Sequence, residues 1–309
     1  VFLFILIFLS ILIFFFFHKD NDKKSFSFFW LSKETSILIN NWFMMYFLSV
    51  VLIGTVYPIF LDVISSQKIS VGPPFYHKLI IPFLIPFLVM MAIGPKLKWI
   101  KSHLEDKIYL IFFFIISILL AFLILKNFNQ KILINTILIS SALYLFFITL
   151  RDFFVKKYKN ISQNIAHFGF SLLILSILFN NLFASEIITN LKVGETFENS
   201  KTKIVFESID QKKEQNYNAI IANFSIFNSK GEKDSFLPEL RIYNQPVIAT
   251  SEAYIKTTLM SDRFIVINLV QNQDYFNVRF QEKPFMLWIW LSVILISFGG
   301  IISFLKKRS

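Results

Sequence analysis

The sequence predicts a polytopic α-helical membrane protein of about seven transmembrane helices, with one small antiparallel β-domain inserted before the last helix on the outer side. Three observations predict this fold class. Of the 309 residues, 55% are hydrophobic and the mean hydropathy is +0.60, which leaves too little polar surface for a soluble domain of this length. Seven apolar stretches are long enough, or nearly so, to cross a hydrocarbon layer of about 30 Å. One long polar stretch, 185–283, alternates like strands.

The expected spans are 1–17, 42–64, 79–94, 108–125, 132–150, 165–184 and 284–305. The first has no basic segment before it and no small-residue cleavage site after it, so we interpret it as a span and not as a signal peptide. Pro58 predicts a kink in the second span, and Pro82 and Pro86 lie inside the third.

Basic residues set the expected topology. The loops after spans one, three, five and seven carry fifteen Lys and Arg residues, whereas the short loops on the other side carry four. Cytoplasmic or matrix loops hold the excess of positive charge in membrane proteins. Residue 1 is therefore expected outside, and the C-terminus inside.

The expected domains are a six-helix transmembrane bundle over 1–184, an outer β-domain over 185–283, and a final transmembrane helix with a basic inner tail over 284–309. Strands are expected at 203–209, 218–227, 264–270 and 275–280. The β-domain holds 12 basic and 13 acidic residues, so the net charge of +11 lies in the membrane loops and does not indicate a nucleic-acid partner.

Composition excludes several kinds of site. The chain has no cysteine, which excludes disulfides, thiolate metal sites and cysteine nucleophiles. It has four histidines, so a multi-histidine metal site within this chain is not expected. Asp62 is the one acid inside the expected spans, which argues against an ion-coupled transporter.

His167 is the candidate ligand, because it opens an apolar span where an imidazole without a partner is costly. Its neighbours on one helix face are Asn164 and Ser171, and the small Ser171 would leave room for a flat ligand. The pattern makes His167 a candidate axial ligand for a haem. The alternative is a histidine that hydrogen-bonds to a neighbouring helix.

Loop 65–78 is a second, weaker candidate for a binding site. Loop 65–78, with Gly72-Pro73-Pro74, predicts a rigid, non-helical backbone that presents Phe75 and Tyr76 at the membrane interface, with His77 exposed. It is either a stiff aromatic anchor or a platform for a flat ligand or peptide.

Carboxylates in the β-domain do not form a catalytic pattern. One side of a strand carries Glu239, Arg241 and Tyr243, which predicts a solvated ion pair. Glu252 lies further along the same domain. We expect no catalytic role for these residues.

Together, seven motifs resemble the C-terminal half of the CcmF-type cytochrome c haem lyases, in order from about residue 1 to 305. The motifs are Val71-Gly-Pro-Pro-Phe-Tyr76, Ile93-Gly94-Pro95, Ala166-His167-Phe168-Gly169, Pro238-Glu239-Leu-Arg241-Ile-Tyr243, Ser251-Glu252-Ala253-Tyr-Ile255, Lys283-Pro284-Phe285 and Trp288-Ile-Trp290.

The resemblance implies cytochrome c maturation, in which haem vinyl groups are joined to the two thiols of a CxxCH motif in apocytochrome c. It implies a haem b between two intramembrane histidines, one of them at the position of His167, and a substrate haem delivered by a haem chaperone. It also implies a thiol-handling maturation subunit. The location would be the inner mitochondrial membrane or, alternatively, the bacterial inner membrane.

The chain departs from the family in lacking the tryptophan-rich outer motif, the two outer histidines that flank it and the second haem b ligand. It therefore resembles a split C-terminal subunit, which we expect to be inactive without an N-terminal half that carries those features. Catalytic residues are unknown. The alternative function is a structural or assembly subunit of a respiratory complex.

Overall fold

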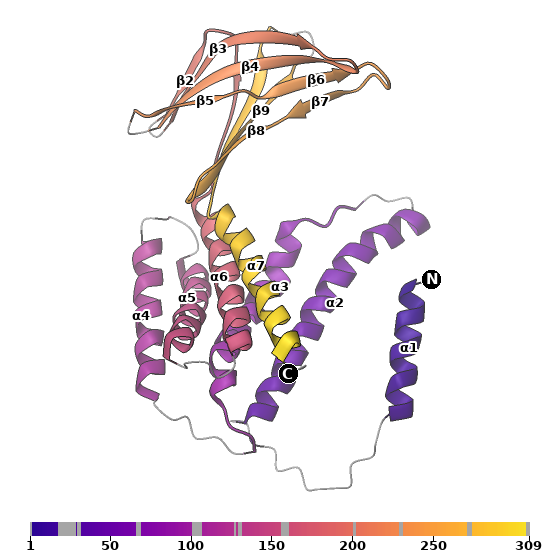
Figure 1. The fold of residues 1–309 in the computed structure, drawn as a ribbon, viewed down its shortest axis with the longest axis vertical. Helices are drawn as coiled ribbons and strands as arrows, with labels where there is room; N and C mark the ends of the chain where they lie inside the picture. The colour runs from indigo at the N-terminus through magenta and orange to yellow at the C-terminus, as the bar shows by residue number, and fades with distance from the viewer. Residues whose placement is uncertain are drawn as a thin grey trace. The chain divides into compact units, whose positions relative to one another are not determined.

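The computed structural model describes residues 2–17, 29, 32–65, 69–100, 107–126, 128, 132–155, 161–199, 202–228, 231–270 and 274–306. Within these ranges, the chain forms helices and a β-sandwich (Figure 1). The helices are α1 (Phe2–Phe17), α2 (Lys33–Ser65), α3 (Pro73–Ile93), the 3₁₀ helix η1 (Gly94–Lys96), α4 (Lys107–Leu125), α5 (Ile132–Val155), α6 (Ile161–Phe183) and α7 (Met286–Lys306). The chain divides into two compact units, 1–80 with 93–107 and 81–92 with 108–309.

The predicted multi-pass membrane protein is confirmed. Among the described residues, six helices are long and apolar enough to cross a membrane, namely α2, α3, α4, α5, α6 and α7. The stretch expected as the first span forms α1, whose 16 residues fall short of the roughly 20 that a span typically needs. The count of about seven apolar helices therefore holds, and α1 is the short one.

The first unit corrects one detail of the sequence prediction. Gly72-Pro73-Pro74 does not hold a non-helical loop, because α3 begins at Pro73 and the Phe75 amide donates to the Gly72 carbonyl at 3.1 Å. Proline is tolerated in the first helical turn, where the amide that it lacks would have no partner within the helix. Pro58 lies inside α2, and the kink expected there stays a prediction.

The β-domain consists of two antiparallel sheets. The strands are β1 (Ser185–Leu191), β2 (Thr196–Glu198), β3 (Thr202–Lys213), β4 (Tyr217–Asn228), β5 (Lys233–Phe236), β6 (Glu239–Tyr243), β7 (Ala249–Glu252), β8 (Tyr254–Thr257), β9 (Ser261–Leu269) and β10 (Phe276–Pro284). One sheet has the order β1-β10-β9-β8, and the other has the order β2-β3-β4-β6-β7. β5 and β6 pair with successive parts of the same strand, β4.

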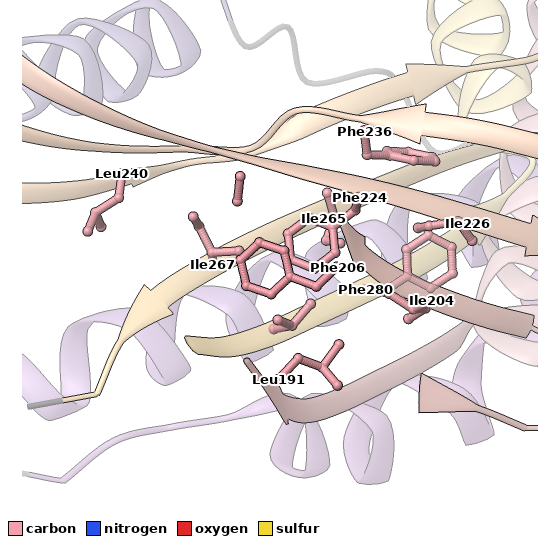
Figure 2. Packing of buried hydrophobic residues seen from close by; sticks show 12 residues of the cluster. Leu191, Ile204, Phe206, Phe224, Ile226, Phe236, Leu240, Ile265, Ile267 and Phe280 are labelled. Atoms are coloured by element: carbon pink, nitrogen blue, oxygen red, sulfur yellow. The ribbon is translucent and has the colours of Figure 1, made fainter. Parts of the chain in front are cut away.

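Alternating apolar residues of both sheets form the core of the sandwich (Figure 2). Phe206 and Phe224 stack at 4.4 Å between ring centroids, and Phe236 packs edge-on against Phe280 of the other sheet at 6.1 Å. In β10 the residues that alternate with the core positions are polar, namely Asn277, Arg279 and Gln281, as expected for a sheet with one solvated face.

The sandwich is joined directly to two membrane helices, since β1 continues from α6 and β10 leads into α7 (Figure 1). β1 and β10 are neighbours and pair from Ser185–Glu282 to Leu191–Phe276. The Asn180 side-chain amide donates to the Pro284 carbonyl at 2.5 Å, which joins the end of α6 to the end of β10. The α6–α7 pair thus forms the stem of the sandwich.

Candidate functional site

The candidate site lies on α6, and glycines hold this helix close to α7. A Cβ atom added to Gly299 of α7 would lie 2.8 Å from the Ala166 nitrogen and from the Ser162 carbonyl oxygen of α6. One added to Gly169 of α6 would lie 3.0 Å from the Ile296 nitrogen. Small residues let membrane helices approach in this way. The glycine of the Ala166–Gly169 motif is therefore required for packing.

A second face of α6 packs against α5. Phe168 lies between two α5 rings, with centroid distances of 5.6 Å to Phe146 and 6.2 Å to Phe153. The Ser171 hydroxyl is 2.9 Å from that of Thr149, also on α5. Two independent contacts therefore fix the rotation of α6 about its own axis.

This rotation determines which neighbours His167 faces. At about 100° per residue, Ser171 lies about 40° to one side of His167, towards α5, and Phe170 about 60° to the other side. Phe170 contacts Phe87 of α3 at 6.2 Å between centroids. Gly169, which faces α7, lies about 160° away. His167 therefore occupies the face of α6 between α5 and the 81–92 part of α3, and it is half-buried there.

The predicted neighbour Ser171 does not offer open space for a flat ligand. Its side chain is fully buried, and besides its contact with Thr149 it donates to the Phe168 carbonyl at 2.8 Å. This corrects the expectation that a ligand would lie over Ser171. Since Ser171 is buried, whereas Phe170 is half-buried against Phe87, a ligand at His167 would approach on the side of Phe170 and not over Ser171.

Positive charge lies near the same end of the helices. The Arg151 guanidinium stacks over the Tyr109 ring at 3.7 Å, and it lies 3.8 Å from the Asp152 carboxylate. The Asn164 side-chain amide donates to the Asp152 carbonyl at 3.2 Å. Asn164, predicted to share a face with His167, thus joins α6 to the last turns of α5.

The donor set fits one axial position of a haem. His167 supplies one imidazole, half-buried among apolar and aromatic residues, and an axial bond to haem iron needs one such nitrogen. Among the described residues there is no group of three or more His, Asp or Glu side chains that could hold a metal ion by itself. His167 can thus supply one of the two axial bonds of a six-coordinate haem.

The other predicted residues lie on α3 and in the sandwich. His77 is exposed on the first turns of α3. Arg241 and Glu239 form the predicted ion pair at 2.9 Å, about 30% exposed on each side chain, and the guanidinium lies 5.0 Å from the Tyr217 ring. Glu252 of β7 lies opposite Glu239 of β6 in the register of the two antiparallel strands. These contacts are those of a sheet surface.

A cavity that the sequence did not indicate lies between α3, α4 and α5. Its volume is about 730 Å³, and its lining is apolar apart from the hydroxyl groups of Thr136, Ser140 and Ser141. The residues of α5 that line it precede Thr149 by two turns or more, so the cavity is separate from His167.

Comparisons with known proteins agree with this architecture. Residues 182–284 match the family described as the CcmF C-terminal beta-sandwich. The chain is similar to proteins named cytochrome c-type biogenesis protein CcmF from Pseudomonas fluorescens, with 26% identity over 90% of this chain and 44% of that protein, and from Haemophilus influenzae, with 25% identity over 90% and 45%. The protein of the same name from Escherichia coli is 22% identical over 90% of this chain and 44% of its own length.

A solved structure named Cytochrome c Heme Lyase CcmF has the same fold, with a TM-score of 0.66 and 20% identity over 88% of this chain and 46% of that one. The chain thus spans less than half the length of the relatives that it matches. Since the matched domain is described as C-terminal, the similarity to the CcmF-type cytochrome c biogenesis proteins is consistent with a C-terminal half of such a protein.

Proposed function

We propose that this chain is a subunit of a cytochrome c haem lyase, which attaches haem covalently to apocytochrome c. One observation carries the proposal. The similarity to CcmF proteins covers the membrane helices and the sandwich together, over about nine tenths of the chain. A second chain would supply the N-terminal half, including the tryptophan-rich motif, and we assign no catalytic residue to this half.

Within this function, His167 would provide one axial ligand to a haem b shared with the N-terminal half. A haem bound there would supply one-electron redox chemistry. The role of this chain is to hold the imidazole in position. Gly169 and Gly299 bring α7 against one face of α6, and Phe168 packs on α5 at another. Both contacts support a fixed direction for His167.

The proposed membrane arrangement has the sandwich outside and the C-terminus inside, in the inner mitochondrial membrane or, alternatively, in a bacterial inner membrane. It is supported by the fifteen basic residues of one set of loops against four of the other. In this arrangement the sandwich shares a compartment with apocytochrome c, the haem chaperone and the thiol-handling subunit, which are the proposed partners.

Holocytochrome formation tests the proposal. This chain and its N-terminal half would be expressed together with an apocytochrome c and a haem chaperone, and covalent haem would be measured by peroxidase staining after denaturing electrophoresis. We expect staining only when both halves are present, and a loss of at least tenfold in His167→Ala.

His77→Ala is the matched control, because His77 is exposed and far from α6 in the sequence. Unchanged staining in the absence of this chain would contradict the proposed function, and would favour a structural subunit. Full staining in His167→Ala would contradict the role of His167 as a haem ligand and would leave the proposed lyase function standing.

A further inference from the structure

The turn between β8 and β9 presents two apolar side chains away from the protein. Leu259 and Met260 are 69% and 64% exposed. The turn itself is tightly held, since the Thr258 hydroxyl donates to the Ser261 carbonyl at 2.7 Å and accepts from the Ser261 amide at 3.1 Å. The two apolar residues are thus presented in a defined position.

This turn is fastened to the start of a membrane helix. The Phe285 amide donates to the Met260 carbonyl at 2.8 Å, and the Trp288 indole donates to the Leu259 carbonyl at 3.0 Å. Phe285 and Trp288 belong to the junction and first turn of α7, one of the helices apolar enough to span a membrane. Figure 1 shows the lower end of β8 and β9 beside the top of α7. The turn therefore lies at the depth where α7 begins.

Charged residues begin one position after the turn, along β9 and on the neighbouring β10. Ser261 pairs with Pro284, but the next pair is Asp262 with Lys283, and the pair after it is Arg263 with Glu282. At about 3.3 Å per residue, both charged pairs lie within roughly 7 Å of the turn. An apolar tip below a belt of charges is the pattern of a protein segment that crosses from water into a lipid interface.

We propose that the β8–β9 turn is an interfacial anchor, with the Leu259 and Met260 side chains inserted in the lipid surface beside the start of α7. Lipid is the occupant that the geometry favours, because the turn is tied to the point at which a spanning helix enters the membrane. Trp288, which holds the turn, is of the residue type enriched at that depth. The anchor would set the height and tilt of the sandwich above the bilayer. This inference uses only the described contacts and does not depend on the proposed function.

The sandwich offers a matched control at its opposite end. Val247 is even more exposed, at 82%, in the loop between β6 and β7. The adjacent strand β7 is joined to the far end of β9, since the Ser251 hydroxyl donates to Asn268 at 2.6 Å. Asn268 is seven residues from Ser261, or roughly 23 Å along the strand. A label at 247 is therefore expected in water.

The absence of cysteine makes the test direct. Leu259→Cys, Met260→Cys and Val247→Cys would each be made in the full chain, labelled with an environment-sensitive fluorophore and reconstituted in phosphatidylcholine vesicles. Size-exclusion chromatography before reconstitution would select folded protein. Quenching would be measured with lipids brominated on the acyl chain and, separately, with iodide in the water.

We expect brominated lipid to quench labels 259 and 260 at least threefold more than label 247, and iodide to give the reverse order. Equal iodide quenching at the three positions would place the turn in water and overturn the proposal. Protection of labels 259 and 260 from both quenchers would show that protein covers the turn, which would also overturn it. The same two readings in the presence of the N-terminal half would extend the test to the assembled protein.

Discussion

Gly299→Ala should weaken the packing of the two helices that carry the sandwich. The added Cβ would lie 2.8 Å from two backbone atoms of α6, the Ala166 nitrogen and the Ser162 carbonyl oxygen, and backbone atoms cannot turn aside as a side chain can. α6 and α7 would have to separate. Overpacking of this kind costs about 1–3 kcal/mol.

Gly300→Ala provides the matched control, because a Cβ at Gly300 would meet no atom within 4 Å. Alanine also favours a helix over glycine by about 0.8–1.0 kcal/mol, and this gain applies to both variants. The difference between their free energies of unfolding therefore isolates the steric cost. We expect Gly299→Ala to be less stable than Gly300→Ala by about 1–3 kcal/mol.

The assay is unfolding of the full chain in detergent micelles by increasing amounts of a denaturing detergent, followed by far-ultraviolet circular dichroism. Gly300→Ala should unfold at the same or a higher denaturant fraction than the unmodified chain, and Gly299→Ala at a lower one. Equal midpoints for the two variants would refute the close approach of α6 and α7 on which the position of His167 depends.

Three further predictions concern the sandwich and the α5–α6 contact. Phe236→Ala should destabilise the sandwich by about 3–5 kcal/mol, because this ring is fully buried in the core, and a change below about 1 kcal/mol in chemical unfolding would contradict that packing. Lys256 and then Arg263 hold the pKa of Asp234 below its usual range, so the folded-state pKa lies below that of the unfolded chain. The stability that this contributes is present above about pH 4 and is lost as the pH falls through the folded-state pKa. In Asp234→Asn the melting temperature should therefore fall less steeply with pH below pH 4 than in the unmodified chain. An unchanged pH dependence would refute the linkage. Ser171→Ala should cost only about 0.6 kcal/mol in the same detergent assay, because Thr149 keeps its own bond to a backbone carbonyl, and a loss above about 2 kcal/mol would show a larger role for this pair.

Much of the fold could be predicted because it depends on long, regular patterns. The apolar stretches appear as helices, and the four predicted strands correspond to the long β3, β4, β9 and β10. The short strands β2, β5, β7 and β8 were not predicted, because three or four residues are too few to show an alternation. Their positions depend on pairing with distant strands.

The candidate site could be predicted in part. His167 was found from its own cost in an apolar helix, whereas Thr149 and Phe87, which determine its surroundings, lie on other helices and carried no local signal. Gly299, which the sequence prediction did not use, faces Ala166 of α6. At Pro73 the prediction of a non-helical loop is wrong. Proline breaks a helix interior, but here it occupies the first position of α3, where it is tolerated.

The most direct test of the account is a reduced-minus-oxidised optical spectrum of this chain, purified alone and then together with its N-terminal half. We predict a b-type band only in the joint preparation, retained in His77→Ala and lost in His167→Ala. A joint preparation with the partner confirmed present and no b-type band, or with the band unchanged in His167→Ala, would contradict the claim that His167 is an axial ligand.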